Sequence, residues 1–526
     1  MTIDAATLKG WLSDGREIAL LDVREAGQFG QGHLFFAVPL PYSRFELGLP
    51  GLVPNKGVRM VLCDGGEEAI AQRAAKRAAA LGYSNVHVLM GGTAGWQRAG
   101  YTLYEGVNVP SKTFGELVEH ERHTPRVTAL QLDAMRGAAE NFVIVDGRPF
   151  AEYRKMSIPG GICCPNGELA LRIGDIAPDP NTKIVVNCAG RTRSIIGAQT
   201  LIDFGVPNPV FALENGTQGW TLAGLALEHG ASRRHGEGIG DNMAALADRA
   251  RALAERRGVA WVTAAQAQTW ALADPSRTTY LIDVRTAEEF TAAAVPGFVH
   301  APGGQLVQST DQWVGVKGAR IVLIDAEGVR APVIASWLRQ LGHEASVLQG
   351  GIAAALGKAW PAVGPSAWLP AKQVSAQEVA DALRHDRAQV LDLRPAMTYR
   401  SGHIAQAHWS IRPRIALAIA DASKTVVVVA DEPGLAALAA LDLAEAGCRD
   451  TLVLAAGPDA WRRAGLSVIA TPDDPPDVDC IDFLFFTHGR HAGNADDARR
   501  YLAWEVGLIA QLDAQERGAF RIAGSG

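Results

Sequence analysis

One short segment, residues 183–201, places a cysteine and two arginines between an apolar run and a helix-forming stretch. The apolar run ends at Cys188, Arg191 and Arg193 follow within five positions, and a new apolar stretch begins after them. Nearby positive charge and a helix N-terminus both favour the reactive thiolate form of cysteine. Backbone N–H groups in a loop that opens a helix bind anions, and arginines hold oxyanions by forked hydrogen bonds. The segment therefore predicts an anion-binding loop around a reactive sulfur.

The predicted site consists of a nucleophile, Cys188, and a cradle made by the six residues after it: Ala189, Gly190, Arg191, Thr192, Arg193 and Ser194. Ser194 is expected to cap the helix. The alternative is that Cys188 is a small buried residue, as free cysteines often are. Two arginines are poor neighbours for a core cysteine, so the functional interpretation is favoured.

The elements that position this loop recur four times along the chain. Each copy has an apolar strand ending in Asp-x-Arg, a second strand, a loop, an alanine-rich helix ending in glycine, and a third strand with a small-residue motif. The interval from the aspartate to that last motif stays between 65 and 70 residues. The four Asp-x-Arg pairs are Asp22 and Arg24, Asp146 and Arg148, Asp283 and Arg285, and Asp392 and Arg394.

Alternation of β-branched strands with helices predicts an α/β fold in each copy, a mainly parallel sheet flanked by helices. Gly82, Gly205, Gly342 and Gly447 are expected to end the helices in the left-handed conformation. The expected units are domain one (1–108), domain two (124–228), domain three (258–362), domain four (370–471) and a helical tail (472–526). In the tail, Asn494 is a predicted helix cap, and Leu502, Val506 and Ile509 form an apolar stripe expected to pack on a neighbouring domain.

The loop after the second strand differs between the copies. Domain one keeps a cysteine, Cys63, but carries Asp64, Glu67 and Glu68 where domain two has arginines. Those carboxylates repel an anion and disfavour a thiolate, so Cys63 is the weaker candidate nucleophile. Asp325 in domain three and Ala430 in domain four stand at the position of Cys188, so both domains are interpreted as scaffolding.

Taken together, these motifs resemble the tandem rhodanese family of sulfurtransferases. The resemblance rests on the Asp-x-Arg strands, the strand-end cysteine loop, the Gly-His pairs at 32–33 and 402–403, and the Gly-Gly-x-x-x-Trp motif that ends at Trp96. It implies ping-pong chemistry through a covalent persulfide, with no other cofactor and no metal. The active cysteine would be Cys188, the loop amides those of Ala189 to Ser194, and the loop arginine Arg193.

The resemblance also implies the partners, a small anionic sulfur donor and a cyanide or thiol acceptor. The mercaptopyruvate branch of the family has a Cys-Gly-x-Gly-Val loop, which this chain lacks, so thiosulfate or a persulfide is the expected donor. Two alternatives stay open. Phosphatases and arsenate reductases of this fold place five residues between Cys and Arg, whereas four precede Arg193 here. The second alternative is a non-catalytic, sulfur-responsive scaffold.

Several further residues have secondary interpretations. Cys163 and Cys164 could accept sulfur from Cys188, although a buried structural role is favoured. Arg172 could add to the anion field or pair with Glu168 one helical turn away. Arg148 is expected to pair with Asp146 and order the active face.

Composition argues against several other classes of protein. A net charge of -6 argues against nucleic acid as a partner, and no apolar run approaches the roughly 20 residues of a membrane span. Six cysteines in 526 residues and no signal-peptide pattern indicate reduced thiols in the cytoplasm. His488, Arg490 and His491 lack the spacing of a metal site. The oligomeric state is not indicated.

Overall fold

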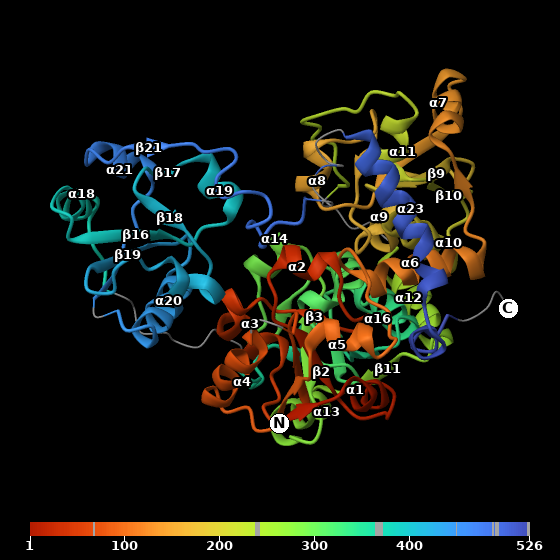
Figure 1. Cartoon of the computed structure of the whole chain (residues 1–526). Helices are drawn as coiled ribbons and strands as arrows, with labels where there is room; N and C mark the ends of the chain where they lie inside the picture. The colour runs from red at the N-terminus through yellow and green to blue at the C-terminus, as the bar shows by residue number, and fades with distance from the viewer. Residues whose placement is uncertain are drawn as a thin grey trace.

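A computed structural model describes residues 1–66, 69–236, 242–362, 372–448, 450–485, 489 and 494–522 (Figure 1). Glu67, Glu68, His488, Arg490 and His491 lie outside these residues. The model contains an α/β unit for each predicted copy, and the sheets of the first three are entirely parallel. The prediction of parallel sheets flanked by helices is confirmed.

Domain one has the strand order β1-β5-β4-β2-β3. Its strands are β1 Thr2–Ile3, β2 Ala19–Asp22, β3 Val38–Pro39, β4 Met60–Cys63 and β5 Val86–Leu89. Its helices are α1 Ala5–Trp11, α2 Ala26–Gln31, η1 Tyr42–Arg44, α3 Phe45–Leu52, α4 Ile70–Ala80 and α5 Gly92–Arg98. A connecting helix, α6 (Val109–Arg122), leads to domain two.

Domain two repeats this order as β6-β10-β9-β7-β8. Its strands are β6 Arg126–Val127, β7 Phe142–Asp146, β8 Ile162–Cys163, β9 Lys183–Asn187 and β10 Val210–Leu213. Its helices are α7 Ala129–Gly137, α8 Phe150–Lys155, α9 Leu169–Ile176, α10 Thr192–Phe204 and α11 Gly216–Leu222. The charged linker helix is α12 (Met243–Arg256).

Domain three has the order β11-β15-β14-β12-β13. Its strands are β11 Ala260–Val262, β12 Thr279–Asp283, β13 Val299–His300, β14 Arg320–Ile324 and β15 Glu344–Leu348. Its helices are α13 Ala264–Gln268, η2 Thr269–Ala273, α14 Ala287–Ala292, α15 Gly303–Gln308, η3 Thr310–Gln312, α16 Arg330–Gln340 and α17 Gly351–Ala355.

Domain four has a parallel sheet of order β18-β16-β19-β20 and a small antiparallel pair, β17 and β21. Its strands are β16 Ala388–Asp392, β17 His403–Ile404, β18 Ala407–Trp409, β19 Thr425–Val429, β20 Thr451–Val453 and β21 Val468–Ile469. Its helices are α18 Ala376–Arg384, α19 Ala396–Ser401, η4 Arg412–Ala418, α20 Pro433–Glu445 and α21 Pro458–Arg463.

Two sequence signals have the same physical role in every domain. In each Asp-x-Arg pair the guanidinium forks onto the aspartate and also donates to a carbonyl eight residues beyond the arginine. The pair therefore orders the chain that leaves the strand. The glycines that end the long helices have φ values from 79° to 95°, as predicted. These glycines are Gly82, Gly205, Gly342 and Gly447.

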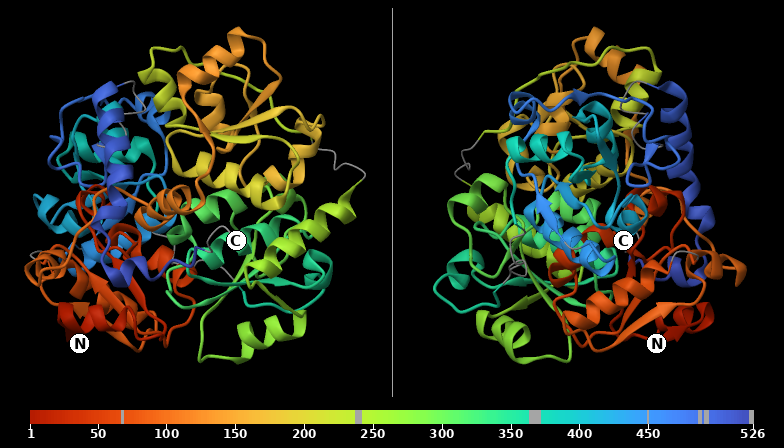
Figure 2. Two further views of the ribbon diagram at one scale, coloured as in Figure 1. Left: turned by 90° about the vertical axis from the view of Figure 1, so that its right-hand side faces the viewer. Right: turned by 60° about the vertical axis from the view of Figure 1, so that its left-hand side comes forward.

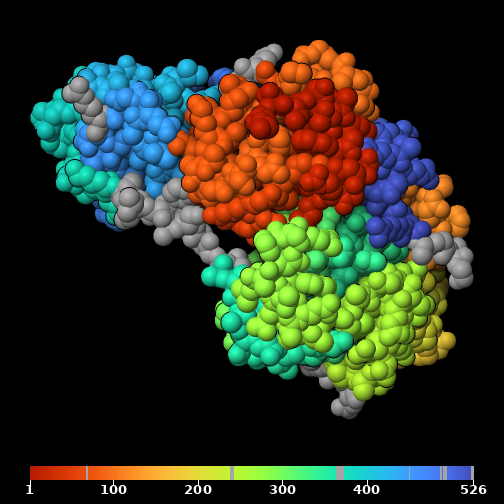
Figure 3. Space-filling view, turned by 90° about the horizontal axis from the view of Figure 1, so that it is seen from below, coloured from red at the N-terminus to blue at the C-terminus, as the bar shows by residue number. Residues whose placement is uncertain are grey.

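The first three domains share one core, whereas domain four is attached differently. The largest hydrophobic cluster contains Phe45 of domain one, Ile195 of domain two and Trp337 of domain three. Domain four has clusters of its own, and it meets domain one through the buried side chain of Arg412, which bonds to Glu46. Figures 1 and 3 show domain four, in cyan to blue, at one side of the other three.

The tail returns from domain four to domain two. Helix α23 (Ala495–Gln511) lies along α6 and contacts α11, on the side of the molecule opposite domain four (Figures 1 and 2). A short helix, α24 (Ala514–Arg517), follows it. Asn494 caps α23 as predicted.

The predicted apolar stripe of the tail is only partly correct. Leu502 is buried, but Val506 is 55% exposed. The buried face instead includes Tyr501 and Glu505, because both bond to Lys112 on α6. Among the described residues, no helix has the length and apolar character required to cross a bilayer.

Candidate active site

The Cys188 loop, residues 188–193, leaves the carboxyl end of the central strand β9 and enters α10. Parallel sheets bind ligands at such ends. Helix α10 begins at Thr192 with Arg191 as its N-cap residue. Ser194 therefore lies inside the first turn and does not cap the helix as predicted; its hydroxyl donates to the carbonyl oxygens of Arg191 and Leu213. The helix starts three residues earlier than a cap at Ser194 would place it.

Hydrogen bonds from α11 set the direction of the peptide groups in this loop. The carbonyl oxygens of Cys188 and Ala189 accept the N–H groups of Thr217 and Gln218 at 2.8 and 3.1 Å. In a trans peptide the next N–H points the opposite way, so the N–H groups of Ala189 and Gly190 point away from α11. No N–H of residues 189–193 has an acceptor within the described part of the chain. The loop thus presents consecutive donors suited to an anion.

These donors border a pocket of about 240 Å³ that several segments build together. Cys188 lines it, although its side chain is almost fully buried. The other lining residues are Ala189 to Arg193 and Glu152 of domain two, Val107, Asn108 and Lys112 at the start of α6, Gln305, Gln308 and Ser309 of domain three, and Tyr501 and Glu505 of the tail.

Arg193 lies beside the sulfur. Its Nη1 and Nη2 donate to the carboxylate of Glu152 on α8 at 2.9 and 2.8 Å. Burial opposes the charge of this guanidinium, but Glu152 and the sulfur of Cys188 together hold the pKa of Arg193 above its ordinary value. A guanidinium has five N–H groups, so donors remain for an anion in the pocket.

Arg191 is placed differently from the expectation. Its guanidinium forks onto Glu116 of α6 at 2.7 and 2.8 Å and also bonds to Glu119. The forked bond expected for an incoming anion is therefore made inside the protein. Arg191 ties the Cys188 loop to α6, which makes it a positioning residue. Sequence reasoning missed Glu116 because it lies 75 residues away along the chain.

The corresponding loops of domains one and three are filled by the protein's own carboxylates. Asp325 accepts the N–H groups of Gly328, Val329 and Ala331 at 3.1, 2.8 and 3.0 Å. In domain one, Asp64 accepts the N–H groups of Gly66 and Ala71. An internal anion thus takes the loop donors that domain two leaves for a ligand.

Cys63 is unsuited to thiolate chemistry for a further reason. Its side chain is fully buried, and burial together with the nearby Asp22 raises the pKa of its thiol well above the usual value. Strand pairing also aligns Cys63 with Asn187, so Asp64 and not Cys63 stands at the position of Cys188.

Asp325 offers a direct test of the internal carboxylate. Asp325→Ala should lower the first thermal transition by about 5 °C or more, because three loop N–H groups, two of them buried, lose a charged acceptor. Asp325→Asn keeps one acceptor oxygen and should lower it less. Scanning calorimetry of the full chain measures both shifts, and equal transitions in all three proteins would show that the carboxylate does not hold the loop.

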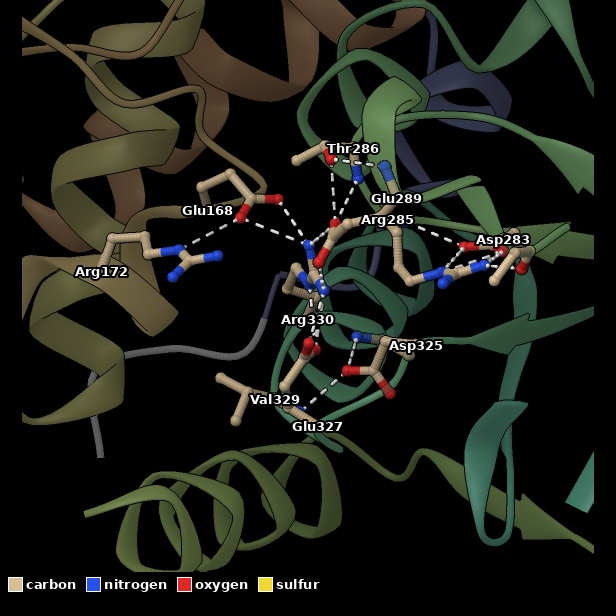
Figure 4. A network of polar contacts seen from close by, with 12 residues as sticks. Glu168, Arg172, Asp283, Arg285, Thr286, Glu289, Asp325, Glu327, Val329 and Arg330 are labelled. Atoms are coloured by element: carbon tan, nitrogen blue, oxygen red, sulfur yellow. Dashed lines mark hydrogen bonds and ion pairs between the residues drawn. The ribbon is translucent and has the colours of Figure 1, made fainter. Parts of the chain in front are cut away.

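Domain three also retains the arginine of the loop. Arg330 lies five positions after Asp325, as Arg193 does after Cys188, and it pairs with Glu289 on α14 as Arg193 pairs with Glu152 on α8. It further bonds to Glu327 and to Glu168 of domain two (Figure 4). The retained arginine therefore joins domains two and three.

Three of the secondary candidates have structural roles. Arg172 pairs with Glu168 at 3.6 Å, one helical turn away, which is one of its two proposed roles (Figure 4). Arg148 forks onto Asp146 as predicted. Cys163 is buried, and burial raises the pKa of its thiol to about 12.

Cys164 is also fully buried, and burial raises the pKa of its thiol well above the usual value. Neither Cys163 nor Cys164 lines the pocket of Cys188. Lys112, Glu152, Tyr501 and Glu505 line that pocket and were missed, because their spacing in the sequence does not mark them.

Comparison with known proteins gives a consistent result. The model of the rhodanese-like domain matches residues 4–99, 128–223, 265–358 and 375–464. The crystal structure of a thiosulfate sulfurtransferase from Pseudomonas aeruginosa is 42% identical, with a TM-score of 0.91, covering 99% of this chain and 98% of that one.

Two curated proteins match smaller parts. An HTH-type transcriptional regulator of Mycobacterium tuberculosis is 34% identical over 111 residues, which are 21% of this chain and 48% of that protein. The chain thus spans about half the length of that relative. The 3-mercaptopyruvate sulfurtransferase of Escherichia coli K12 is 26% identical, over 38% of this chain and 88% of that protein.

Proposed function

The chain belongs to the rhodanese-like domain family, and we propose that it is a sulfurtransferase of the thiosulfate sulfurtransferase kind with Cys188 as the sulfur carrier. The observation that carries the assignment is the Cys188 loop: a cysteine at a strand end with consecutive N–H groups that no described residue accepts. The full-length similarity to the Pseudomonas aeruginosa enzyme supports the same reaction class.

The reaction proceeds in two displacements. The Cys188 thiolate attacks the outer sulfur of thiosulfate, the S–S bond of the donor breaks, and sulfite leaves with the electron pair. The resulting persulfide anion lies against the N–H groups of residues 189–193, which stabilise its charge. Cyanide or a thiolate then attacks the outer sulfur, the bond to Cys188 breaks, and the Cys188 thiolate is restored.

A paired assay distinguishes this function from its alternatives. Purified protein should form thiocyanate from thiosulfate and cyanide, leave an aryl phosphate intact, and gain the mass of one sulfur atom on the peptide of Cys188. Turnover of the phosphate alone would identify a phosphatase. A sulfur adduct without turnover would identify the sulfur-responsive scaffold.

The two loop arginines should differ in kinetics. Arg193→Ala is expected to raise the KM for thiosulfate by about tenfold or more, because a charged hydrogen-bond donor beside the sulfur is lost. Arg191→Ala should mainly lower kcat, since its bonds to Glu116 hold the loop rather than the donor. Steady-state kinetics with varied thiosulfate measure both.

Arg193→Lys serves as the control, because it keeps the charge without the fork and should raise the KM less than Arg193→Ala. The same rise in KM for the Arg191 and Arg193 variants would contradict the separate roles.

Three finer assignments belong to the same proposal. Thiosulfate or a persulfide is the donor rather than mercaptopyruvate, because the loop lacks the sequence of that branch. The boundaries 1–108, 124–228, 258–362 and 370–471 enclose the four matched ranges. The cytoplasm is the proposed compartment, since all six cysteines are free.

A further inference from the structure

The tail brings side chains from outside the matched domains into the Cys188 pocket. The last matched range ends at residue 464, whereas Tyr501 and Glu505 on α23 line the pocket. They lie four residues apart, on the same face of the helix. Both are buried, with exposed fractions of 2% and 1%. A solvent-facing helix would not bury a glutamate unless it had partners inside.

Glu505 has such partners on the pocket wall. Its Oε1 accepts from Nζ of Lys112 at 2.9 Å and from the hydroxyl of Thr192 at 3.2 Å. A methyl group built on Gly190 would lie 3.0 Å from its Oε2. The carboxylate therefore contacts the Cys188 loop itself, and the hydroxyl of Tyr501 bonds to Lys112 beside it.

Glu505 completes a pattern in which carboxylates compensate the cations around the pocket. Arg193 pairs with Glu152, Arg191 pairs with Glu116 and Glu119, and Lys112 pairs with Glu505. Lys112 comes from α6 and the carboxylate of Glu505 from the tail, so α23 brings a negative charge to this wall. At low local dielectric, one uncompensated charge a few ångströms from a ligand changes its binding strongly.

We propose that Glu505 determines which thiol acceptors the pocket takes, by bringing a negative charge to the pocket wall and so favouring cationic and neutral thiols over anionic ones. This rests on the proposed function. The N–H groups of the loop still bind the persulfide anion, whereas the acceptor meets the wall formed by Lys112 and Glu505. Its thiolate bonds to the outer sulfur, the bond to Cys188 breaks, and a new persulfide leaves.

Three small thiols of similar size test the charge preference: cysteamine carries an ammonium group, 2-mercaptoethanol is neutral, and mercaptoacetate carries a carboxylate. The full-length protein is loaded with thiosulfate, and the loss of sulfur from Cys188 is followed by mass spectrometry in a single turnover. Rates are divided by the thiolate fraction of each acceptor. The wild type should react fastest with cysteamine and slowest with mercaptoacetate.

Variants of the pair should shift this preference in opposite directions. Glu505→Gln should lower the rate ratio of cysteamine to mercaptoacetate by about tenfold or more, because a negative charge is removed from the pocket wall. Lys112→Gln should raise the ratio, and the double variant should return near the wild type. Asp496→Asn, on the exposed first turn of α23, removes a carboxylate away from the pocket and should leave the ratio unchanged.

The outcomes separate this inference from the proposed function. Equal slowing of all three thiols by Glu505→Gln, or a wild-type preference for mercaptoacetate, would overturn the role of Glu505. If Glu505→Gln does not fold, the order of the three thiols in the wild type and the shift of the rate ratio in Lys112→Gln test the role of Glu505. Absence of any sulfur adduct on Cys188 would instead overturn the proposed function.

Discussion

Cys188→Ser is expected to abolish sulfur transfer, with a loss of turnover on the order of 10⁴-fold or more. A serine hydroxyl at this position is not ionised at neutral pH and cannot form the persulfide on which the second displacement depends. The exchange of sulfur for oxygen is small, so the buried position should accommodate it without change of fold. Thiocyanate formation from thiosulfate and cyanide measures the loss.

Cys63→Ser is the control, because Cys63 is the other candidate nucleophile, although the strand pairing aligns it with Asn187 and not with Cys188. Its thiol is buried with a raised pKa, and Asp64 occupies the neighbouring N–H groups. Turnover and the sulfur adduct should therefore persist in Cys63→Ser. Retained turnover in Cys188→Ser, with loss in Cys63→Ser, would move the chemistry to domain one.

Gly216→Ala is expected to lower kcat by about a hundredfold although it replaces no group that meets the substrate. A Cβ at Gly216 would lie 2.2 Å from the carbonyl oxygen of Cys188, and the residue has φ of +53°. The loop must move to admit the methyl group, so its N–H groups lose their alignment on the sulfur. Single-turnover formation of the persulfide measures the effect on the first displacement.

Gly351→Ala imposes the same strain in domain three, where a Cβ would lie 2.3 Å from the carbonyl oxygen of Asp325 and φ is +50°. It should reduce stability but keep the activity per folded molecule. Circular dichroism and calorimetry of both variants account for changes in folding. Equal loss of kcat in the two variants would show that the strain acts through global stability and not through the Cys188 loop.

The loops of domains one and three differ from the Cys188 loop in more than the missing nucleophile. In domain three one substitution, Asp325, both removes the sulfur and supplies a carboxylate for the loop N–H groups. Domain one has the same exchange: Cys63 aligns with Asn187, so Asp64 stands at the position of Cys188 and accepts the loop N–H groups. In both loops a single carboxylate therefore replaces the nucleophile and also occupies the donors of the anion site.

The sequence by itself determined the four repeats, the parallel α/β units and the position of Cys188 after a central strand. These features depend on interactions between near neighbours along the chain: a strand that ends just before Cys188, an arginine that pairs with an aspartate two residues away, and glycines that end helices. Such interactions repeat wherever the local pattern repeats, so four copies reinforce the same prediction.

Only the tertiary structure decided what surrounds the sulfur. Arg191 has a sequence position suited to the donor, yet Glu116 on α6 takes its guanidinium. Glu505 meets Lys112 across 393 residues of chain, and the helical pattern of the tail favoured Val506 for the buried face. The direction of a charged side chain is set by whichever partner packing brings within reach, and that partner comes from a distant segment whose approach no local pattern encodes.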